Sequence, residues 1–353
     1  MLSDRIQDRK VDHLTLCAER DVAFRERTTL LEQVQLVHQA LPELSWDEVD
    51  TSVELCGKEL AAPVYISGMT GGTEKAERIN ADLATAAQAL GIAMGLGSQR
   101  PMLGDRSLAK TYSVRDVAPD ILLFGNIGIV QARELSAQAL TDLVGAVGAD
   151  ALCVHLNPAM ELVQPGGDRD FRRGEETLAR LVEELPVPVI VKEVGSGLSA
   201  EVAGRLRRAG VTHLDVAGAG GTSWVGVETL RAKEEAKALG ELFWDWGIPT
   251  AASLLQVRDS GLTILASGGL RNGIDMARAL ALGASAAGLA TPALKAQRSG
   301  GPRAVEELMS VCIRSIHTAL FLCGCRSVRE LWRTPRVLGE ELARWADLGG
   351  EGA

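Results

Sequence analysis

Short apolar runs recur along most of this chain of 353 residues, and each stops at a cluster of glycine and small polar residues. Eight runs start at intervals of mostly about 30 residues, the length of one strand and helix unit in a parallel sheet. Stretches with helical periodicity lie between them, and several close near a glycine that can end a helix. The apolar runs are Val64–Ser67, Ile92–Leu96, Ile121–Phe124, Ala151–Val154, Val187–Val191, His213–Val216, Thr263–Ala266 and Ala286–Leu289, and the helical stretches include Ala81–Leu90, Ala139–Val147, Glu175–Glu184, Ala200–Ala209 and Gly273–Leu282.

Alternating strands and helices in this number predict an α/β fold with a closed (β/α)8 barrel, or TIM barrel. A doubly wound open sheet is the alternative, but eight evenly repeated units favour closure. We expect the barrel in residues 62–303, preceded by an N-terminal extension, residues 1–61, and followed by a C-terminal helical tail, residues 304–353. The extension includes a strand-like stretch at Val49–Leu55. We expect it to cover one end of the barrel and to contribute to the substrate site.

The charge and composition of the chain narrow the classes of partner. A net charge of −9 argues against a nucleic acid or an anionic membrane surface, because such partners bind basic faces. No stretch approaches the roughly 18 apolar residues of a membrane-spanning helix, and the charged start does not resemble a secretion signal. We therefore expect a cytoplasmic protein. The six cysteines lack metal-binding spacing and are expected to be structural.

The last two apolar runs end in residues suited to a phosphate group. Gly268 and Gly269 follow the seventh run, and Ala290 and Thr291 follow the eighth. Glycines there let backbone N–H groups approach a phosphate, and the next helix adds the positive end of its dipole. An ordinary tight turn is the alternative for the glycine pair. Lys192 directly follows the fifth run, and in a flavin-binding barrel a lysine there stabilises the reduced ring.

With these residues assembled, the chain resembles the type 2 isopentenyl diphosphate isomerases, which depend on FMN. The likeness extends over essentially the whole chain, and the order of several motifs carries it. These motifs are Arg9-Lys10-x-x-His13, Met69-Thr70-Gly71-Gly72, Gly97-Ser98-Gln99, Asn126, His155-Leu156-Asn157, Val191-Lys192-Glu193-Val194-Gly195, Ala219-Gly220-Gly221-Thr222-Ser223-Trp224 and Ala266-Ser267-Gly268-Gly269.

The resemblance implies a set of binding and catalytic residues. Glu161 would bind Mg²⁺, which usually takes one carboxylate and keeps several waters. His155, Met160 and Trp224 are the expected catalytic residues; for Trp224, core packing in the loop after the sixth run is the alternative. The residues expected to bind FMN are Gly68, Met69, Thr70, Ser98, Asn126, Lys192, Thr222, Gly268, Gly269, Leu270, Ala290 and Thr291. Those expected to bind the substrate are Arg9, Lys10, His13, Ser98, Gln99, Arg100, Asn157 and Met160.

The reaction implied by the resemblance moves a double bond without net redox change. A proton is added to the terminal alkene carbon of isopentenyl diphosphate and another leaves C2, which gives dimethylallyl diphosphate. Reduced FMN would serve as acid and base, with NADPH needed only to reduce it beforehand. Water would capture the carbocation-like centre, so the pocket must be dry. The resemblance also implies a homo-oligomer, a tetramer or an octamer.

One residue departs from the family pattern. The pattern reads His-Leu-Asn-x-x-Gln-Glu, whereas this chain reads His155-Leu156-Asn157-Pro158-Ala159-Met160-Glu161. A methionine carries no exchangeable proton, so a proton relay through this side chain is excluded. Three alternatives stay open: the flavin suffices and Met160 shapes the pocket, the enzyme is slow, or the protein binds flavin or isoprenoid diphosphate for another task.

A redox flavoenzyme of the same barrel type, such as a 2-hydroxy-acid oxidase, is a further alternative. Such enzymes need a histidine base and arginines that grip a carboxylate near the flavin. The seventh run ends instead in Ser267-Gly268-Gly269. The sequence therefore favours the isomerase.

Overall fold

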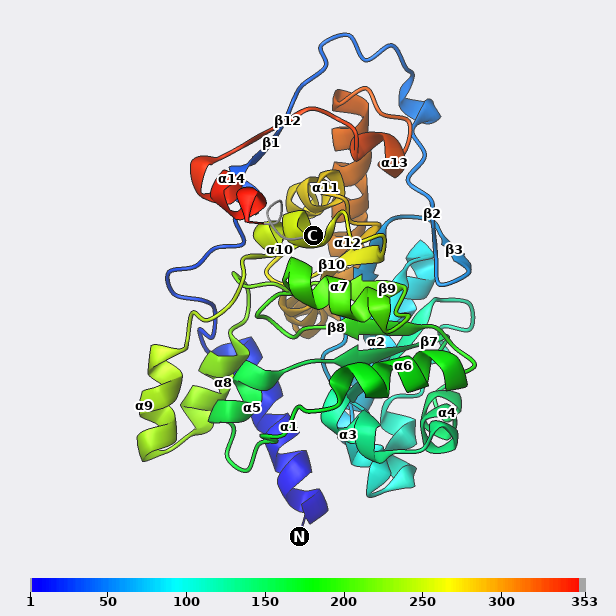
Figure 1. Ribbon diagram of the computed structural model, residues 1–353. Coiled ribbons are helices and arrows are strands. Elements are labelled where there is room, and N and C mark those ends of the chain that lie inside the picture. Colours follow the sequence, from blue (N-terminus) through cyan, green and yellow to red (C-terminus); the bar gives the residue numbers. More distant parts are fainter. Residues whose placement is uncertain (1, 349–353) are drawn as a thin grey trace.

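The computed structural model describes the backbone of residues 2–348 and, within it, the side chains of residue 10 and of residues 12–348. Eight parallel strands form a closed barrel at the centre of the molecule (Figure 1). Each strand pairs with the next along the chain, and the eighth pairs with the first, which confirms the predicted fold. The strands are β4 (Val64–Ile66), β5 (Ala93–Gly95), β6 (Leu123–Gly128), β7 (Ala151–His155), β8 (Val189–Lys192), β9 (His213–Asp215), β10 (Thr263–Ala266) and β11 (Ala286–Leu289).

The observed strands overlap all eight predicted runs, and the third differs most. β6 begins and ends later than the predicted run Ile121–Phe124. It continues to Gly128 because it pairs with β7 at five successive positions, from Phe124 to Gly128. Asn126 therefore lies within the strand rather than after it, where the barrel holds its side chain in a fixed place.

Helices pack around the outside of the barrel. Their starts follow ordinary capping chemistry, because the side chains of Thr73, Ser136, Ser199 and Asn272 each accept a hydrogen bond from a first-turn N–H group. Gly91 ends α2 in the left-handed conformation that glycine adopts without cost. The helices are α2 (Glu74–Leu90), α3 (Ile129–Glu134), α4 (Ala137–Gly145), α6 (Gly174–Glu184), α7 (Ala200–Arg208), α10 (Thr250–Val257), α11 (Gly273–Ala281) and α12 (Thr291–Leu322), with α5 (Pro158–Val163), α8 (Trp224–Arg231) and α9 (Glu234–Leu242) in the strand-to-helix connections.

The N-terminal segment contributes to both ends of the barrel. Strands β2 (Val53–Leu55) and β3 (Lys58–Leu60) form an antiparallel hairpin, whose Leu55 and Leu60 pack into the barrel interior beside residues at the strand starts. Of the predicted strand Val49–Leu55, only the last three residues form a strand, β2, and its partner β3 was not predicted. Helix α1 (Leu2–Glu19) packs instead against α8, α12 and the short helix η3 (Arg100–Leu103), at the strands' carboxyl ends.

The tail is not purely helical. α12 is interrupted at Gly300 and Gly301, and α13 (Val328–Leu331) and α14 (Glu340–Asp347) follow it. Between them, β12 (Arg336–Leu338) pairs antiparallel with β1 (Val34–Leu36) near the other end of the chain. All six cysteines are free thiols. In the part of the chain that the structure describes, no helix combines the length and the apolar character that crossing a bilayer would require.

Candidate functional site

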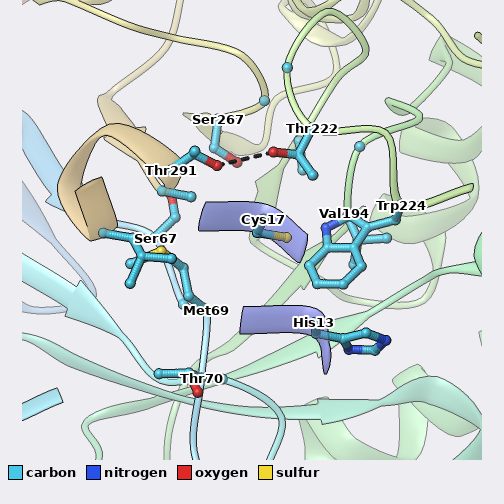
Figure 2. Close-up of a pocket in the computed structure, with 18 of the residues that line it drawn as sticks. His13, Cys17, Ser67, Met69, Thr70, Val194, Thr222, Trp224, Ser267 and Thr291 are labelled. Carbon is cyan, nitrogen blue, oxygen red and sulfur yellow. Dashed lines mark hydrogen bonds between the residues drawn. The ribbon is translucent and has the colours of Figure 1, made fainter. Parts of the chain in front are cut away.

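One cavity of about 490 Å³ opens at the carboxyl ends of the barrel strands, and residues at the ends of all eight strands line it. Figure 2 shows His13 and Cys17 from α1 on the same side of this cavity as Val194 and Trp224, with Ser67, Met69 and Thr291 on the other side. The predicted site residues that line it are Lys10, His13, Gly68, Met69, Thr70, Ser98, Arg100, Asn126, His155, Asn157, Met160, Glu161, Lys192, Thr222, Trp224, Gly268, Gly269, Leu270, Ala290 and Thr291.

Among the predicted substrate residues whose side chains the structure describes, Gln99 does not lie in this lining. The side chain of Arg9 is outside the described residues. Gln99 is fully buried behind the wall, where its amide donates to the Leu143 carbonyl (2.9 Å) and accepts from the Asn126 N–H (2.9 Å). Gln99 thus holds β6 in place, and its position does not support the predicted contact with substrate. Its neighbour Ser98 lines the cavity. Side chains alternate between two faces in a strand but not in an irregular loop, so the sequence could not show which of Ser98 and Gln99 faces the cavity.

One end of the cavity is lined by the glycine pair and the helix start for which the sequence predicts a phosphate seat. Gly268 and Gly269 both have positive φ values, 95° and 77°. α12 begins next to them at Thr291, whose Oγ1 lies 3.0 Å from that of Thr222 (Figure 2). A glycine turn and a helix N-terminus thus both lie at this end of the cavity, an arrangement suited to a phosphate group. Two cations that sequence reasoning missed, Arg271 and Lys295, line the same end; they follow the glycine pair and Thr291 by only a few residues.

Hydrogen bonds fix the tautomer of His155. The Asn126 amide nitrogen donates to the Leu96 carbonyl at 3.0 Å, so its oxygen faces His155 Nδ1, 2.8 Å away. That oxygen accepts a proton held on Nδ1, which leaves the lone pair on Nε2. Burial, assisted by the nearby cations Lys192, Lys10 and Arg100, lowers the pKa of His155 to about 3.

His155 is therefore expected to remain neutral over the physiological range. Nitrogen-15 NMR of protein labelled at histidine should show one ring with a protonated Nδ1 and a bare Nε2 throughout about pH 5 to 8. The spectrum of the His155→Gln variant assigns the signal. An imidazolium pattern appearing for His155 within that range would contradict the expectation.

The helix α1 is fastened to the barrel on two sides. Lys10 Nζ donates to the Ser98 carbonyl (2.7 Å) and to the Tyr112 hydroxyl (2.9 Å). On the opposite side, His13 Nε2 lies 2.7 Å from an oxygen of Glu228, and its ring meets Trp224 edge-on with 5.1 Å between centroids. These contacts hold α1 across the cavity.

Glu228, which was not predicted, links this helix to α8. Its side chain is fully buried, and Arg231 Nη1 lies 2.6 Å from its second carboxylate oxygen. Burial alone would raise the pKa of Glu228, but the hydrogen bonds and charges of His13 and Arg231 outweigh it, so the pKa is lowered. Glu228 is therefore a buried anion that orients His13.

Glu161, on α5, is a buried carboxylate with several donors. It accepts hydrogen bonds from the side chains of Asn157 and Gln164, both at 2.9 Å, and from the N–H of Asp168 at 2.7 Å. The described residues contain no group of three His, Cys, Asp or Glu side chains that could hold a metal. Glu161 thus fits a Mg²⁺ ion only where water and substrate oxygens supply the other ligands.

Met160 occupies the cavity wall beside this carboxylate. Its sulfur lies 3.9 Å from the Asn157 amide nitrogen. Gln164, one turn further along the chain, is buried, and its amide nitrogen donates to Glu161. It therefore does not supply an amide in place of Met160. The connection that follows β7 therefore presents a thioether to the cavity.

The loop after β8 is held by Glu193. One carboxylate oxygen of this residue accepts from three successive N–H groups, those of Val194 (2.6 Å), Gly195 (2.7 Å) and Ser196 (2.5 Å). Burial raises the pKa of Glu193 to about 7, although these donors act in the opposite direction. The turn that they form places Val194 in the cavity wall next to Lys192.

Known proteins share both the sequence and the fold. The model of the FMN-dependent dehydrogenase family matches residues 2–156 and 168–338. Isopentenyl-diphosphate delta-isomerases of Methanosarcina mazei and Methanothermobacter thermautotrophicus are 45% and 44% identical to this chain, over 94% and 98% of its length and 91% and 97% of their own. The enzyme of that name from Halobacterium salinarum is 46% identical over 95% of this chain and 94% of its own.

Among solved structures, a mandelate oxidase variant with benzaldehyde superposes with a TM-score of 0.66 over 94% of this chain and 95% of its own. At 20% identity, this likeness concerns the fold alone. Identity of about 45% along nearly the whole chain is much more specific. The chain belongs to the type 2 isopentenyl-diphosphate delta-isomerases, within the family of FMN-dependent dehydrogenases.

Proposed function

We propose that this protein converts isopentenyl diphosphate into dimethylallyl diphosphate with the help of FMN. The observation that carries the proposal is the cavity at the barrel rim, which most of the predicted flavin and diphosphate residues line, in a chain about 45% identical to named isomerases. When bound and reduced, FMN supplies acid and base chemistry. The residues of this chain bind, orient and shield the reactants.

The donor set suits FMN. Gly268, Gly269 and the N-terminus of α12 are an anion seat for its phosphate. Lys192 stands at the end of β8, where its ammonium would stabilise negative charge on the N1 and C2 carbonyl edge of the ring. Thr70, in the loop after β4, and Asn126, on β6, add neutral hydrogen-bonding groups to the same cavity.

The substrate seat is cationic and lies beside the flavin seat. Lys10, His13 and Arg100 bring their donors to a diphosphate, and Ser98 and Asn157 add neutral ones. We infer that Arg9 joins them, as the family resemblance implies. Neutral His155 leaves a lone pair on Nε2 and adds no further positive charge near the reacting carbons.

Shielding from water is the second task of the chain. α1 crosses the cavity with Leu14 buried on it, and Val22 lies buried just beyond its end. Trp224 adds an aromatic wall. A dry, apolar pocket keeps water from the carbocation-like centre that forms when the alkene is protonated.

Four parts of the proposal go beyond what membership of the family establishes. Glu161 would bind a Mg²⁺ ion shared with the diphosphate. NADPH would reduce FMN before the first turnover. The protein would act as a homo-oligomer, a tetramer or an octamer, and residues 1–61 would contribute to the substrate site as an extension of the barrel.

The reaction can be tested directly. Reduced, FMN-loaded protein is incubated anaerobically with isopentenyl diphosphate in D₂O and followed by NMR. Deuterium in dimethylallyl diphosphate supports the proposal. Consumption of NADPH in proportion to substrate would indicate a dehydrogenase instead, and substrate that binds unchanged would indicate a protein with a binding role.

Met160→Gln tests whether the thioether limits this enzyme. The glutamine amide restores the hydrogen-bond donor and acceptor that the family pattern has at this position. Turnover is therefore expected to rise about tenfold, which corresponds to an activation free energy lowered by about 1.4 kcal/mol. Met160→Leu is the matched control, because it keeps size and apolarity, and should leave turnover within about twofold. Equal turnover of the Gln variant and the original protein would show that the flavin suffices.

A further inference from the structure

A second, much smaller void lies inside the barrel, below the floor of the main cavity. Its volume is about 10 Å³. Interior residues such as Phe124 and Ile190 form its apolar walls, while Ser67 and Lys192 belong to its lining and to that of the main cavity. A space of this size holds one water molecule, provided that polar groups face it.

The first polar residue that lines this void is Ser67. The residue is 7% exposed, and its Oγ atom is buried without a hydrogen-bond partner among the described residues. A hydroxyl taken out of water without a partner destabilises the folded protein. Its donor position and both acceptor positions remain to be filled.

The second polar group is the carboxylate of Asp215, on β9. Its Oδ1 accepts from the Ser267 hydroxyl (2.7 Å) and the Ala217 N–H (3.1 Å), and its Oδ2 accepts from the Tyr65 hydroxyl (2.9 Å). A carboxylate has about four acceptor positions, so one position on Oδ2 remains. Asp215 is 2% exposed and belongs to the lining of the void.

The third polar group is the ammonium of Lys192, which the strand register places opposite Asp215. It donates to the Glu193 carbonyl at 2.5 Å. Since an ammonium has three donors, two remain for the main cavity above and the void below. Three residues with complementary hydrogen-bonding groups thus line one water-sized space.

We propose that this void binds one water molecule, which bridges Ser67 Oγ, the Lys192 ammonium and Asp215 Oδ2. A buried water usually has about three hydrogen-bond partners. Cavities without such polar partners stay empty, so the polar lining distinguishes this void from them. The bridge makes Asp215 a positioning residue, because it ties the ammonium at the cavity floor to a buried anion. This consequence, but not the water site itself, rests on the proposed binding of FMN.

A high-resolution crystal structure of the FMN-loaded protein tests the site. The expected result is an ordered water within hydrogen-bond distance of Ser67 Oγ and of Asp215 or Lys192. An empty void, or a Ser67 hydroxyl bonded to the flavin instead, would overturn the proposal. Neither outcome depends on isomerase activity, so failure here is distinct from failure of the proposed reaction.

Thermal unfolding of Ser67→Ala gives a second test, because the change in Tm has opposite signs with and without the bound water. If the hydroxyl binds a water, its removal costs that water a partner and lowers Tm. If the hydroxyl has no partner, its removal relieves an unsatisfied group and raises Tm. A raised Tm would therefore argue against the water.

The positioning role of Asp215 has its own measurement, the midpoint potential of bound FMN. Asp215→Asn removes a buried negative charge below the cavity floor and should shift the potential to more positive values, because reduced flavin carries added negative charge. Asp142→Asn, which makes the same change on the exposed face of α4, should leave the potential unchanged. Equal potentials for both variants would exclude the coupling.

Discussion

The Gly268→Ala variant is expected to lose most of its bound FMN. Gly268 has a φ of 95°, and a Cβ atom added there would lie 2.2 Å from the carbonyl oxygen of Gly218 and 2.3 Å from its nitrogen. The backbone conformation alone costs an ordinary residue about 1–3 kcal/mol. Because the obstructing atoms are backbone, the turn itself must move, and the proposed phosphate seat moves with it.

Flavin absorbance per mole of purified protein, followed by titration with FMN, measures this loss. We expect the dissociation constant to rise at least about tenfold, which corresponds to 1.4 kcal/mol. Gly145→Ala is the matched control, because nothing lies within 4 Å of the added carbon and its φ is not positive. Retention of FMN by Gly268→Ala at the original affinity would show that the phosphate sits elsewhere.

Glu228→Gln is expected to weaken both the fold and the binding of substrate. The change leaves Arg231 without its buried anion, a loss on the order of 3 kcal/mol in the free energy of unfolding at neutral pH. It also frees His13 from the carboxylate that orients it, so KM for the diphosphate substrate should rise while FMN affinity stays the same. Urea unfolding and steady-state kinetics measure the two effects.

The stability effect should depend on pH in a definite direction. The pKa of Glu228 is lower in the folded protein than its ordinary value of 4.5. Its contribution is therefore complete above pH 4.5 and disappears as the pH falls through the folded-state pKa. The difference between the original protein and Glu228→Gln should shrink in acid, whereas Glu235→Gln, on the exposed part of α9, should show little difference at any pH. A difference that persists in acid would contradict the role of the charge.

Much of the barrel could be predicted because its signals are local. A buried parallel strand is a short apolar run, and a turn that approaches a ligand uses glycine, so Ser267, Gly268 and Gly269 mark the end of β10 in the sequence itself. The same reasoning placed Lys192 at the rim. These assignments need no knowledge of distant contacts.

What could not be predicted depends on partners far along the chain. β12 is three residues long, and only its pairing with β1 makes it a strand. Glu228 resembles any helical glutamate until α1 brings His13 against it, 215 positions away in sequence. Gln99 sits in a motif that the resemblance assigns to the site, yet its side chain turns into the wall.

The pairing of β1 with β12 also bears on how the protein is made. Residues 34–36 must wait for residues 336–338, about 300 positions later, which takes roughly 15 to 60 seconds at the ordinary pace of a ribosome. Over that time the emerging chain carries an early segment whose strand partner does not yet exist. α1 meets a similar delay, since it packs on α8 and α12. The parts that keep water from the reaction are thus among the last to assemble. A chaperone would therefore have to bind the early segment during synthesis, before the active fold is complete.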